Sequence, residues 1–159
     1  MRKTVIGPDV GSDLDLFEGV DGVDGLPHSE AVAVELPEYT RVFVSGTGAV
    51  DDNGDVVAPG DPPAQLRTIL ESIEEMLAAV DGRMRDVVRL TVLTEELTEE
   101  EYLDVCRVRQ SFLAAEHEPA SLMNETDDVG IDGMCLEVEA DAVVPHDGWE
   151  LEHISSDSG

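Results

Sequence analysis

Basic residues are scarce in this sequence of 159 residues. Nine Lys and Arg stand against 37 Asp and Glu, which gives a formal net charge of −28, and no Lys or Arg follows Arg109. So acidic a chain repels phosphate backbones and anionic lipid headgroups. We therefore predict a protein that binds neither nucleic acids nor membranes.

Cysteine is also rare, with Cys106 and Cys135 as the two examples. Neither residue belongs to a Cys-x-x-Cys or Cys/His cluster, so the sequence does not support a zinc site. Two isolated thiols are typical of small buried side chains in a reducing compartment. We expect no metal and no cofactor.

Long apolar runs are missing as well. No stretch approaches the roughly 20 apolar residues that cross a bilayer. The basic start "MRKTVI" is not followed by the apolar segment of a signal peptide. We therefore expect a cytoplasmic protein.

The lack of positive charge raises the question of how the chain folds, because excess charge of one sign opposes collapse. Hydrophobic residues nevertheless make up 42% of the sequence, and they recur periodically in its middle. This favours a folded domain with an acidic surface, as in organisms that keep molar salt in the cytoplasm. At 1 M salt the Debye length is only about 3 Å, so self-repulsion is largely screened. We predict a halophilic protein.

The chain divides into three segments. Residues 1–26 include a long Gly- and Asp-rich stretch without periodicity, which predicts an N-terminal arm or loop. Residues 27–145 carry the patterns of one folded domain. Residues 146–159 form a polar C-terminal tail with Trp149 as its candidate anchor.

Local patterns predict five main strands and two helices within the domain. The first helix has Asp61 as its cap, Pro62 in its first turn and Gly82 as a left-handed residue at its end. The second begins with a capping box from Thr98 to Glu101, and its predicted apolar face starts at Tyr102. A brief strand follows the Asn53-Gly54 turn. Apolar alternation and β-branched runs predict the main strands at 31–36, 41–46, 86–94, 120–123 and 134–144.

This order of elements predicts an α+β sandwich with a mixed sheet and both helices on one face. On the last strand the apolar residues alternate with Glu137, Glu139 and Asp141. Three carboxylates in a row are not buried without partners. The acidic face is therefore expected to be wet, to form a cleft, or to be covered by another subunit.

The sequence contains, in this order, the blocks "MRKTVI", "PHSEAV", "RVFVSGTGAVDDNGDVV", "DVVRLTVLT", "FLAAEHEPAS" and "LEVEADAVV". These six blocks resemble, in the same order, those of the RidA/YjgF family. The likeness spans about residues 27–145 and implies a chorismate-mutase-like fold. It further implies a homotrimer with a central barrel and a cleft for a small-molecule metabolite at each subunit interface. Active members hydrolyse enamines and imines to a keto acid and ammonia.

The resemblance also implies site residues. The glutamate that positions the attacking water corresponds to Glu137, the candidate catalytic residue. The family arginine that grips the substrate carboxylate corresponds to Ser121, and losing it removes about 1.5–3 kcal/mol per charge-assisted hydrogen bond. His28, Thr47 and Leu93 replace a tyrosine, a glutamine and an aromatic residue. The candidate ligand-binding residues are His28, Ser45, Gly46, Thr47, Leu93 and Ser121.

Three functions remain open at this point. The first is a cleft that has diverged from 2-imino acid deamination and prefers a neutral or cationic ligand. The second is an active imine deaminase that recruits Arg89 or Arg109 in place of the family arginine. The third is a non-catalytic trimer with a regulatory or holdase role.

Overall fold

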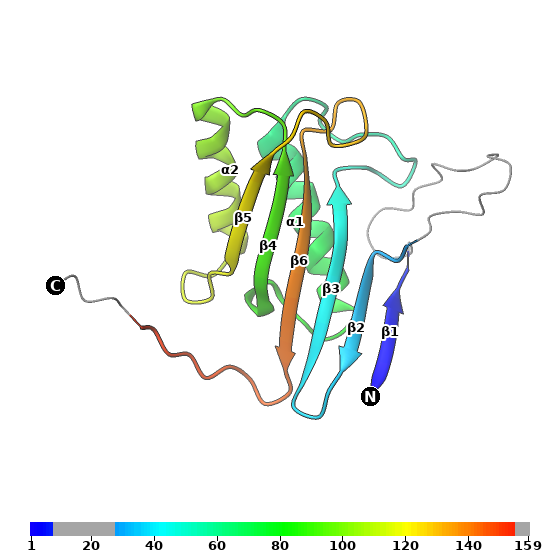
Figure 1. Ribbon diagram of the computed structural model, residues 1–159, viewed down its shortest axis with the longest axis vertical. Helices are drawn as coiled ribbons and strands as arrows, with labels where there is room; N and C mark the ends of the chain where they lie inside the picture. The colour runs from blue at the N-terminus through cyan, green and yellow to red at the C-terminus, as the bar shows by residue number, and fades with distance from the viewer. Residues whose placement is uncertain (8–27, 155–159) are drawn as a thin grey trace, which may run out of the picture.

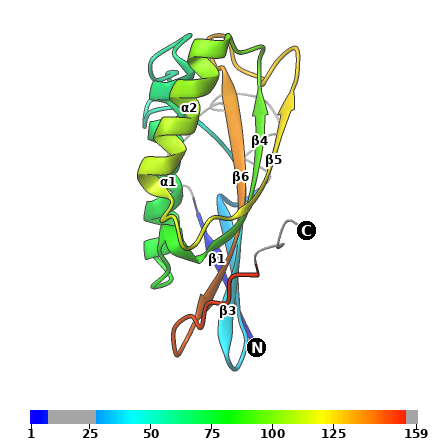
Figure 2. The same cartoon turned by 90° about the vertical axis from the view of Figure 1, so that its left-hand side faces the viewer.

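A computed structural model describes residues 1–7 and 28–154 of the chain. Six strands form one sheet in the order β1-β2-β3-β6-β4-β5, in which β4 and β5 are parallel and the other neighbours antiparallel. Both helices cover the same face (Figures 1 and 2). The predicted α+β architecture is thus confirmed. The elements are β1 (Arg2–Ile6), β2 (Ala31–Glu35), β3 (Tyr39–Gly48), α1 (Pro62–Ala78), the 3₁₀ turn η1 (Met84–Asp86), β4 (Val87–Thr94), α2 (Glu99–Phe112), β5 (Ala120–Glu125) and β6 (Leu136–Pro145).

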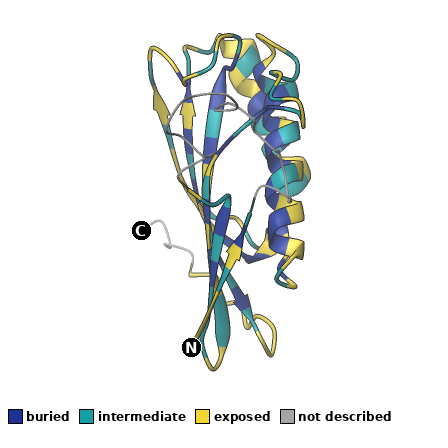
Figure 3. Ribbon diagram, turned by 90° about the vertical axis from the view of Figure 1, so that its right-hand side faces the viewer, coloured by how far each residue is buried: buried dark blue, intermediate teal, exposed yellow. Residues whose placement is uncertain are grey.

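The core lies between α1 and the covered face of the sheet (Figure 3). Alternate residues of β6 face the helices and are buried, while the residues between them face the other side. The same alternation in β3 and β4 completes one apolar cluster with the inner side of α1. The face of the sheet opposite the helices is called the open face below; β6 contributes Glu137, Glu139 and Asp141 to it.

The ends of α1 follow from local chemistry. Asp61 caps the helix by accepting a hydrogen bond from the Ala64 N–H at 3.1 Å, as predicted. The left-handed residue after the helix is Asp81, with φ 61°, and not Gly82. Gly82 is needed for a different reason, because a Cβ there would lie 2.9 Å from Val144 Cγ2. The glycine lets the chain turn closely against β6.

The second helix is less buried than its sequence pattern predicts. Thr98 and Glu101 form the expected capping box. The buried residues of α2 are Val105 and Val108, whereas Tyr102 is 49% exposed, so its predicted place on the buried face was wrong. The helix lies on the same side of the sheet as α1, near β4 and β5 (Figure 2), and its two buried residues are the part that reaches the core.

Two strand assignments differ from the sequence expectation. The segment after Asn53-Gly54 makes one isolated bridge, Val50 to Val56, in place of the predicted strand. The Asp51 carboxylate closes this turn by accepting the N–H groups of Asn53 and Asp55. Conversely, β1 lies within the predicted N-terminal arm and pairs with β2. The rest of that arm, residues 8–27, lies outside the described residues.

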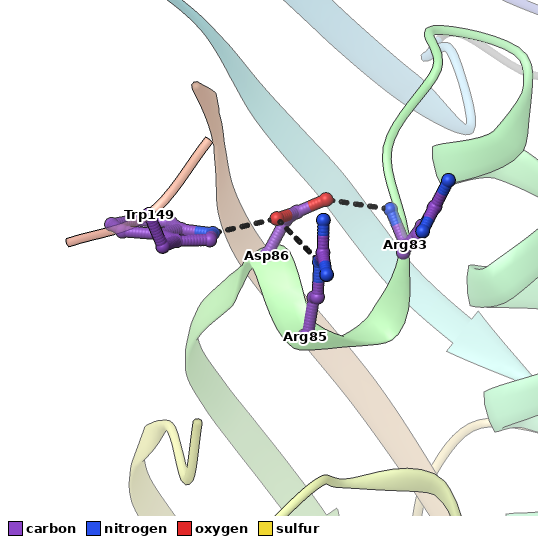
Figure 4. A network of polar contacts seen from close by, with 4 residues as sticks. All are labelled: Arg83, Arg85, Asp86 and Trp149. Carbon is purple, nitrogen blue, oxygen red and sulfur yellow. Dashed lines mark hydrogen bonds and ion pairs between the residues drawn. The ribbon is translucent and has the colours of Figure 1, made fainter. Parts of the chain in front are cut away.

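The C-terminal tail is tied to the domain through Trp149 (Figure 4). Its indole Nε1–H donates to Asp86 Oδ1 at 2.7 Å. Asp86 is buried, and its Oδ2 accepts the backbone N–H of Arg83 at 2.8 Å. The Arg85 side chain approaches the same carboxylate at 3.9 Å. Trp149 therefore satisfies a buried charge at the start of β4.

Trp149→Phe should lower the free energy of unfolding by about 1–2 kcal/mol, because the buried Asp86 carboxylate loses a hydrogen bond to a charged acceptor. Urea unfolding followed by far-UV circular dichroism measures this change. Leu151→Ala is the matched control, since Leu151 lies in the same tail and is 43% exposed. Equal stability of both variants would show that the indole contact does not stabilise the domain.

Candidate functional site

The candidate site lies on the open face, where Glu137 stands in the middle of the sheet. Its cross-strand partners are Leu93 on β4 and Gly48 on β3. Leu93 is in turn the partner of Asn124 on β5. Because directly paired residues project from the same face of a sheet, Leu93 and Asn124 share the open face with Glu137, while Gly48 leaves its position there without a side chain.

Gly46 approaches the carboxylate more closely than any side chain would allow. A Cβ built on Gly46 would lie 2.2 Å from Glu137 Oε1. The register between β3 and β6 shifts between Val44 and Thr47, which brings this part of β3 towards Glu137. The missing side chain leaves room for the carboxylate beside the backbone of β3.

The pKa of Glu137 is raised above the ordinary value of 4.5. Partial burial is the main cause, since it disfavours the charged form, and the neighbouring charge of Glu139 adds to it. The charge of His28, just before β2, acts in the opposite direction. This half-buried carboxyl group is consequently a stronger base than an exposed one.

Three of the other candidate residues lie around Glu137, and the remaining ones make their contacts elsewhere. His28, Gly46 and Leu93 lie around Glu137. Ser45 is close by, but its hydroxyl donates to the Ser29 carbonyl at 2.7 Å and thereby holds the segment that carries His28. Thr47 is buried as the partner of Val138 on the covered face, and its hydroxyl donates to the Ser45 carbonyl.

Ser121 lies on the opposite face from Glu137. Its partner on β4 is Leu90, which is buried under the helices, and its hydroxyl accepts a hydrogen bond from Arg109 of α2 at 2.7 Å. The β5 residues on the open face are Ala120, Leu122 and Asn124. None of these three carries a charge, so β5 supplies no cation beside Glu137.

Of the two arginines considered as replacements, Arg89 shares a face with Glu137 and Arg109 does not. Arg89 pairs with Asp141 on the open face. With Thr91, Glu139 and Phe43 it lines a shallow cavity of about 300 Å³. Asp141 follows Glu137 by four residues, about 13 Å along an extended strand. Arg89 therefore stands apart from the immediate surroundings of Glu137.

A buried glutamine fixes the start of β6 two residues before Glu137. Gln65 of α1 is fully buried, and its Nε2 donates to the carbonyls of Ala58 at 3.1 Å and Gly133 at 2.8 Å. Its Oε1 accepts the Cys135 N–H at 2.7 Å. Sequence reasoning missed this residue; a polar side chain inside the apolar stripe of the first helix was the available signal.

Comparison with known proteins settles the family. Residues 26–144 match the family described as endoribonuclease L-PSP, whose members include proteins named RidA and YjgF. The chain belongs to the RidA/YjgF family. Part of it is similar to the 3-aminoacrylate deaminase RutC of Acinetobacter baylyi, with 46% identity over 46 residues, which are 29% of this chain and 36% of RutC. The match thus spans about a third of that relative's length.

Solved structures of the family share the fold. Yeast Mmf1 gives a TM-score of 0.70 at 15% identity, covering 90% of this chain and 99% of that one. Rv2704 of Mycobacterium tuberculosis gives 0.67 at 24% identity, with 90% and 100% covered. Escherichia coli TdcF with bound serine gives 0.65 at 24% identity, with 88% and 98% covered. Among the residues described for the present chain, no helix is long and apolar enough to cross a membrane.

Proposed function

We propose that this RidA/YjgF protein hydrolyses small imines or enamines at Glu137, and that it takes neutral or cationic substrates in place of 2-imino acids. The supporting observation is the partly buried Glu137 carboxyl group, with its raised pKa, beside Gly46 and His28. The residues paired across the sheet in the row of Glu137 are Gly48, Leu93 and Asn124, and none of them is Lys or Arg. An anionic substrate beside Glu137 would therefore meet a carboxylate and no paired cation, because Arg89 lines the separate cavity further along β6 with Glu139.

The chemistry proposed for Glu137 is general base catalysis. Ionised Glu137 takes a proton from a water molecule as that water adds to the imine carbon. Protonation of the nitrogen then lets ammonia leave while the carbonyl forms, so that imine and water become carbonyl compound and ammonia. A neighbouring negative charge stabilises a protonated imine, which is the form that water attacks most readily.

A second copy of the chain completes the cleft in this proposal, as part of a homotrimer. The open face exposes Val5, Phe43, Leu93 and Leu122 by between 37% and 59%. Apolar residues gathered on one uncovered face of a sheet are typical of a surface that packs against a partner. The family name suggests a ribonuclease, but the net charge of −28 makes RNA an unfavourable substrate.

A pair of substrates that differ only in the carboxylate tests this function. An oxidase acting on alanine generates 2-iminopropionate, and an amine oxidase acting on ethylamine generates the same imine without the carboxylate. Trapping by semicarbazide, in competition with the protein at high salt, measures both hydrolysis rates. We expect kcat/KM to be at least about tenfold higher for the imine without the carboxylate. The reason is that the site offers the carboxylate of 2-iminopropionate no charge-assisted hydrogen bond, and one such bond is worth about tenfold.

The second candidate function is deamination of 2-imino acids with Arg89, which is favoured by its position on the open face. In that case 2-iminopropionate would be the better substrate, and Arg89→Gln would abolish its advantage. Arg107→Gln serves as the control, because Arg107 is an exposed residue of α2 paired with Asp104. Hydrolysis of neither imine would instead favour the non-catalytic trimer.

A further inference from the structure

A second cavity lies on the helix side of the molecule, between α2 and the loop that leads into β5. Its volume is about 460 Å³. It is separate from the candidate site, because its lining residue Arg109 bonds Ser121, which pairs with buried Leu90, whereas Glu137 pairs with exposed Leu93. We propose that this outer cavity binds a short-chain organic monocarboxylate through Arg109. The cavity is lined by Cys106, Arg109, Gln110, Leu113, Glu118 and Pro119, among others.

Arg109 is the group that points to an anionic ligand. It is half-buried, and one of its terminal nitrogens donates to Ser121 Oγ at 2.7 Å. The ion pairs found among the described residues involve Arg2, Arg85 and Arg107, but not Arg109. A guanidinium offers five N–H donors, and a carboxylate matches two of them at once.

Ser121 holds the guanidinium in place at the edge of the sheet. The hydrogen bond joins the last turn of α2 to the start of strand β5, twelve residues later. A side chain that is already ordered loses less conformational entropy when a ligand binds. The pair Arg109–Ser121 is therefore a pre-oriented cation at the rim of a cavity.

The other walls select the kind of carboxylate. Leu113, Ala115 and Pro119 provide an apolar surface, and Gln110 provides an amide. Pockets of a few hundred Å³ with mainly apolar walls and a few polar or charged groups suit small organic molecules. Glu118 lines the same cavity, and its charge disfavours a ligand with a second negative group. A monocarboxylate with a short alkyl chain meets all of these conditions.

Butyrate and butyramide are the probes that test this site, because they have nearly the same shape and differ in charge. Titrations followed by ¹H–¹⁵N NMR, at fixed pH and ionic strength, report which backbone amides respond. We expect butyrate to shift amides within residues 106–121 and to leave those around Glu137 unchanged. Butyramide should cause no saturable shift. Arg109→Gln should weaken butyrate binding about tenfold, the effect of losing one charge-assisted hydrogen bond.

Three further variants separate binding from folding. Arg109→Lys keeps the charge but not the two-pronged donor, so its affinity should fall between the wild type and Arg109→Gln. Arg107→Gln, on the same helix, and Glu137→Gln, on the other face, should bind butyrate as the wild type does. Equal responses to butyrate and butyramide in the wild-type protein would overturn the proposal without any variant. Unchanged affinity in Arg109→Gln would show that Arg109 only joins α2 to β5. The proposal does not rest on the function assigned to Glu137.

Discussion

In about 2 M KCl, this protein should unfold at a temperature about 10 °C or more above its unfolding temperature in about 0.1 M KCl. The net charge of −28 is the cause. Among the described residues only three ion pairs are found, so most carboxylates face solvent without a cationic partner. For a domain of this size a change of 1 kcal/mol moves the midpoint by about 2–4 °C. A shift of about 10 °C therefore corresponds to about 2.5–5 kcal/mol of repulsion removed by screening.

Two controls distinguish screening from a general effect of the solvent. Sucrose at the same water activity stabilises compact states without screening charge, so it should give only part of the KCl effect. At acidic pH the carboxylates become neutral, and the salt response should shrink. Calorimetry or thermal circular dichroism measures both. A midpoint that does not depend on KCl would contradict the prediction of a halophilic protein.

Much of the fold could be predicted because its signals are local. The cap at Asp61 and the capping box at Thr98 each depend on a few consecutive residues, and both were confirmed. The alternation along β6 was equally readable, since one face of that strand is buried and the other is not. A strand that is defined mainly by its pairing with a neighbour, in contrast, leaves little signal in its own local sequence. For this reason β1, which is held by its register with β2, was missed.

The candidate site was predicted less completely, for reasons that lie in the edge strand β5. Five of its six residues are exposed, so the sequence carries no alternation that reveals which side chains face the helices. The side to which Ser121 points depends on its register with β4 and on its contact with Arg109. Both are contacts between residues that are distant in the sequence, and the local pattern does not reveal them. Arg89 lies on a strand with a clear buried face, and its side could have been read from the pattern at 87–94.

The largest expected loss of activity follows from removing the base. Glu137→Gln should lower kcat for imine hydrolysis about 100-fold or more, as expected when a general base is lost. In the wild type the rate should rise with pH through the pKa of Glu137, because the ionised form accepts the proton. That rise should lie above pH 4.5, since the pKa is raised by burial and by Glu139. Initial rates across a pH series measure it, and an unchanged profile in Glu137→Gln would remove Glu137 from the mechanism.

The raised pKa of Glu137 also determines whether Glu137→Gln is more or less stable than the wild type. A carboxyl group with a raised pKa in the folded state contributes stability at low pH, and this contribution is lost as pH rises through that pKa. Glu137→Gln should therefore be more stable than the wild type at neutral pH and equal to it at pH values below about 4.5. The gain should stay under about 1 kcal/mol, because the group is half-exposed and water screens its charge. Loss of activity together with a gain in stability is the combination expected of a functional carboxylate.

Gly46→Ala tests whether the position of the Glu137 carboxylate matters as well as its presence. The added methyl group would lie 2.2 Å from Glu137 Oε1 in the present arrangement, so the carboxylate must move. Its flexible side chain can do so at little cost to the fold. A displacement of about 1 Å at a reacting group can cost about 100-fold in rate. Gly48→Ala is the control: its methyl group meets the Met134 side chain instead, with Sδ at 2.7 Å, and leaves Glu137 in place. If Gly46→Ala and Gly48→Ala hydrolyse imines at the same rate while both stay folded, the reacting carbon does not lie beside Glu137.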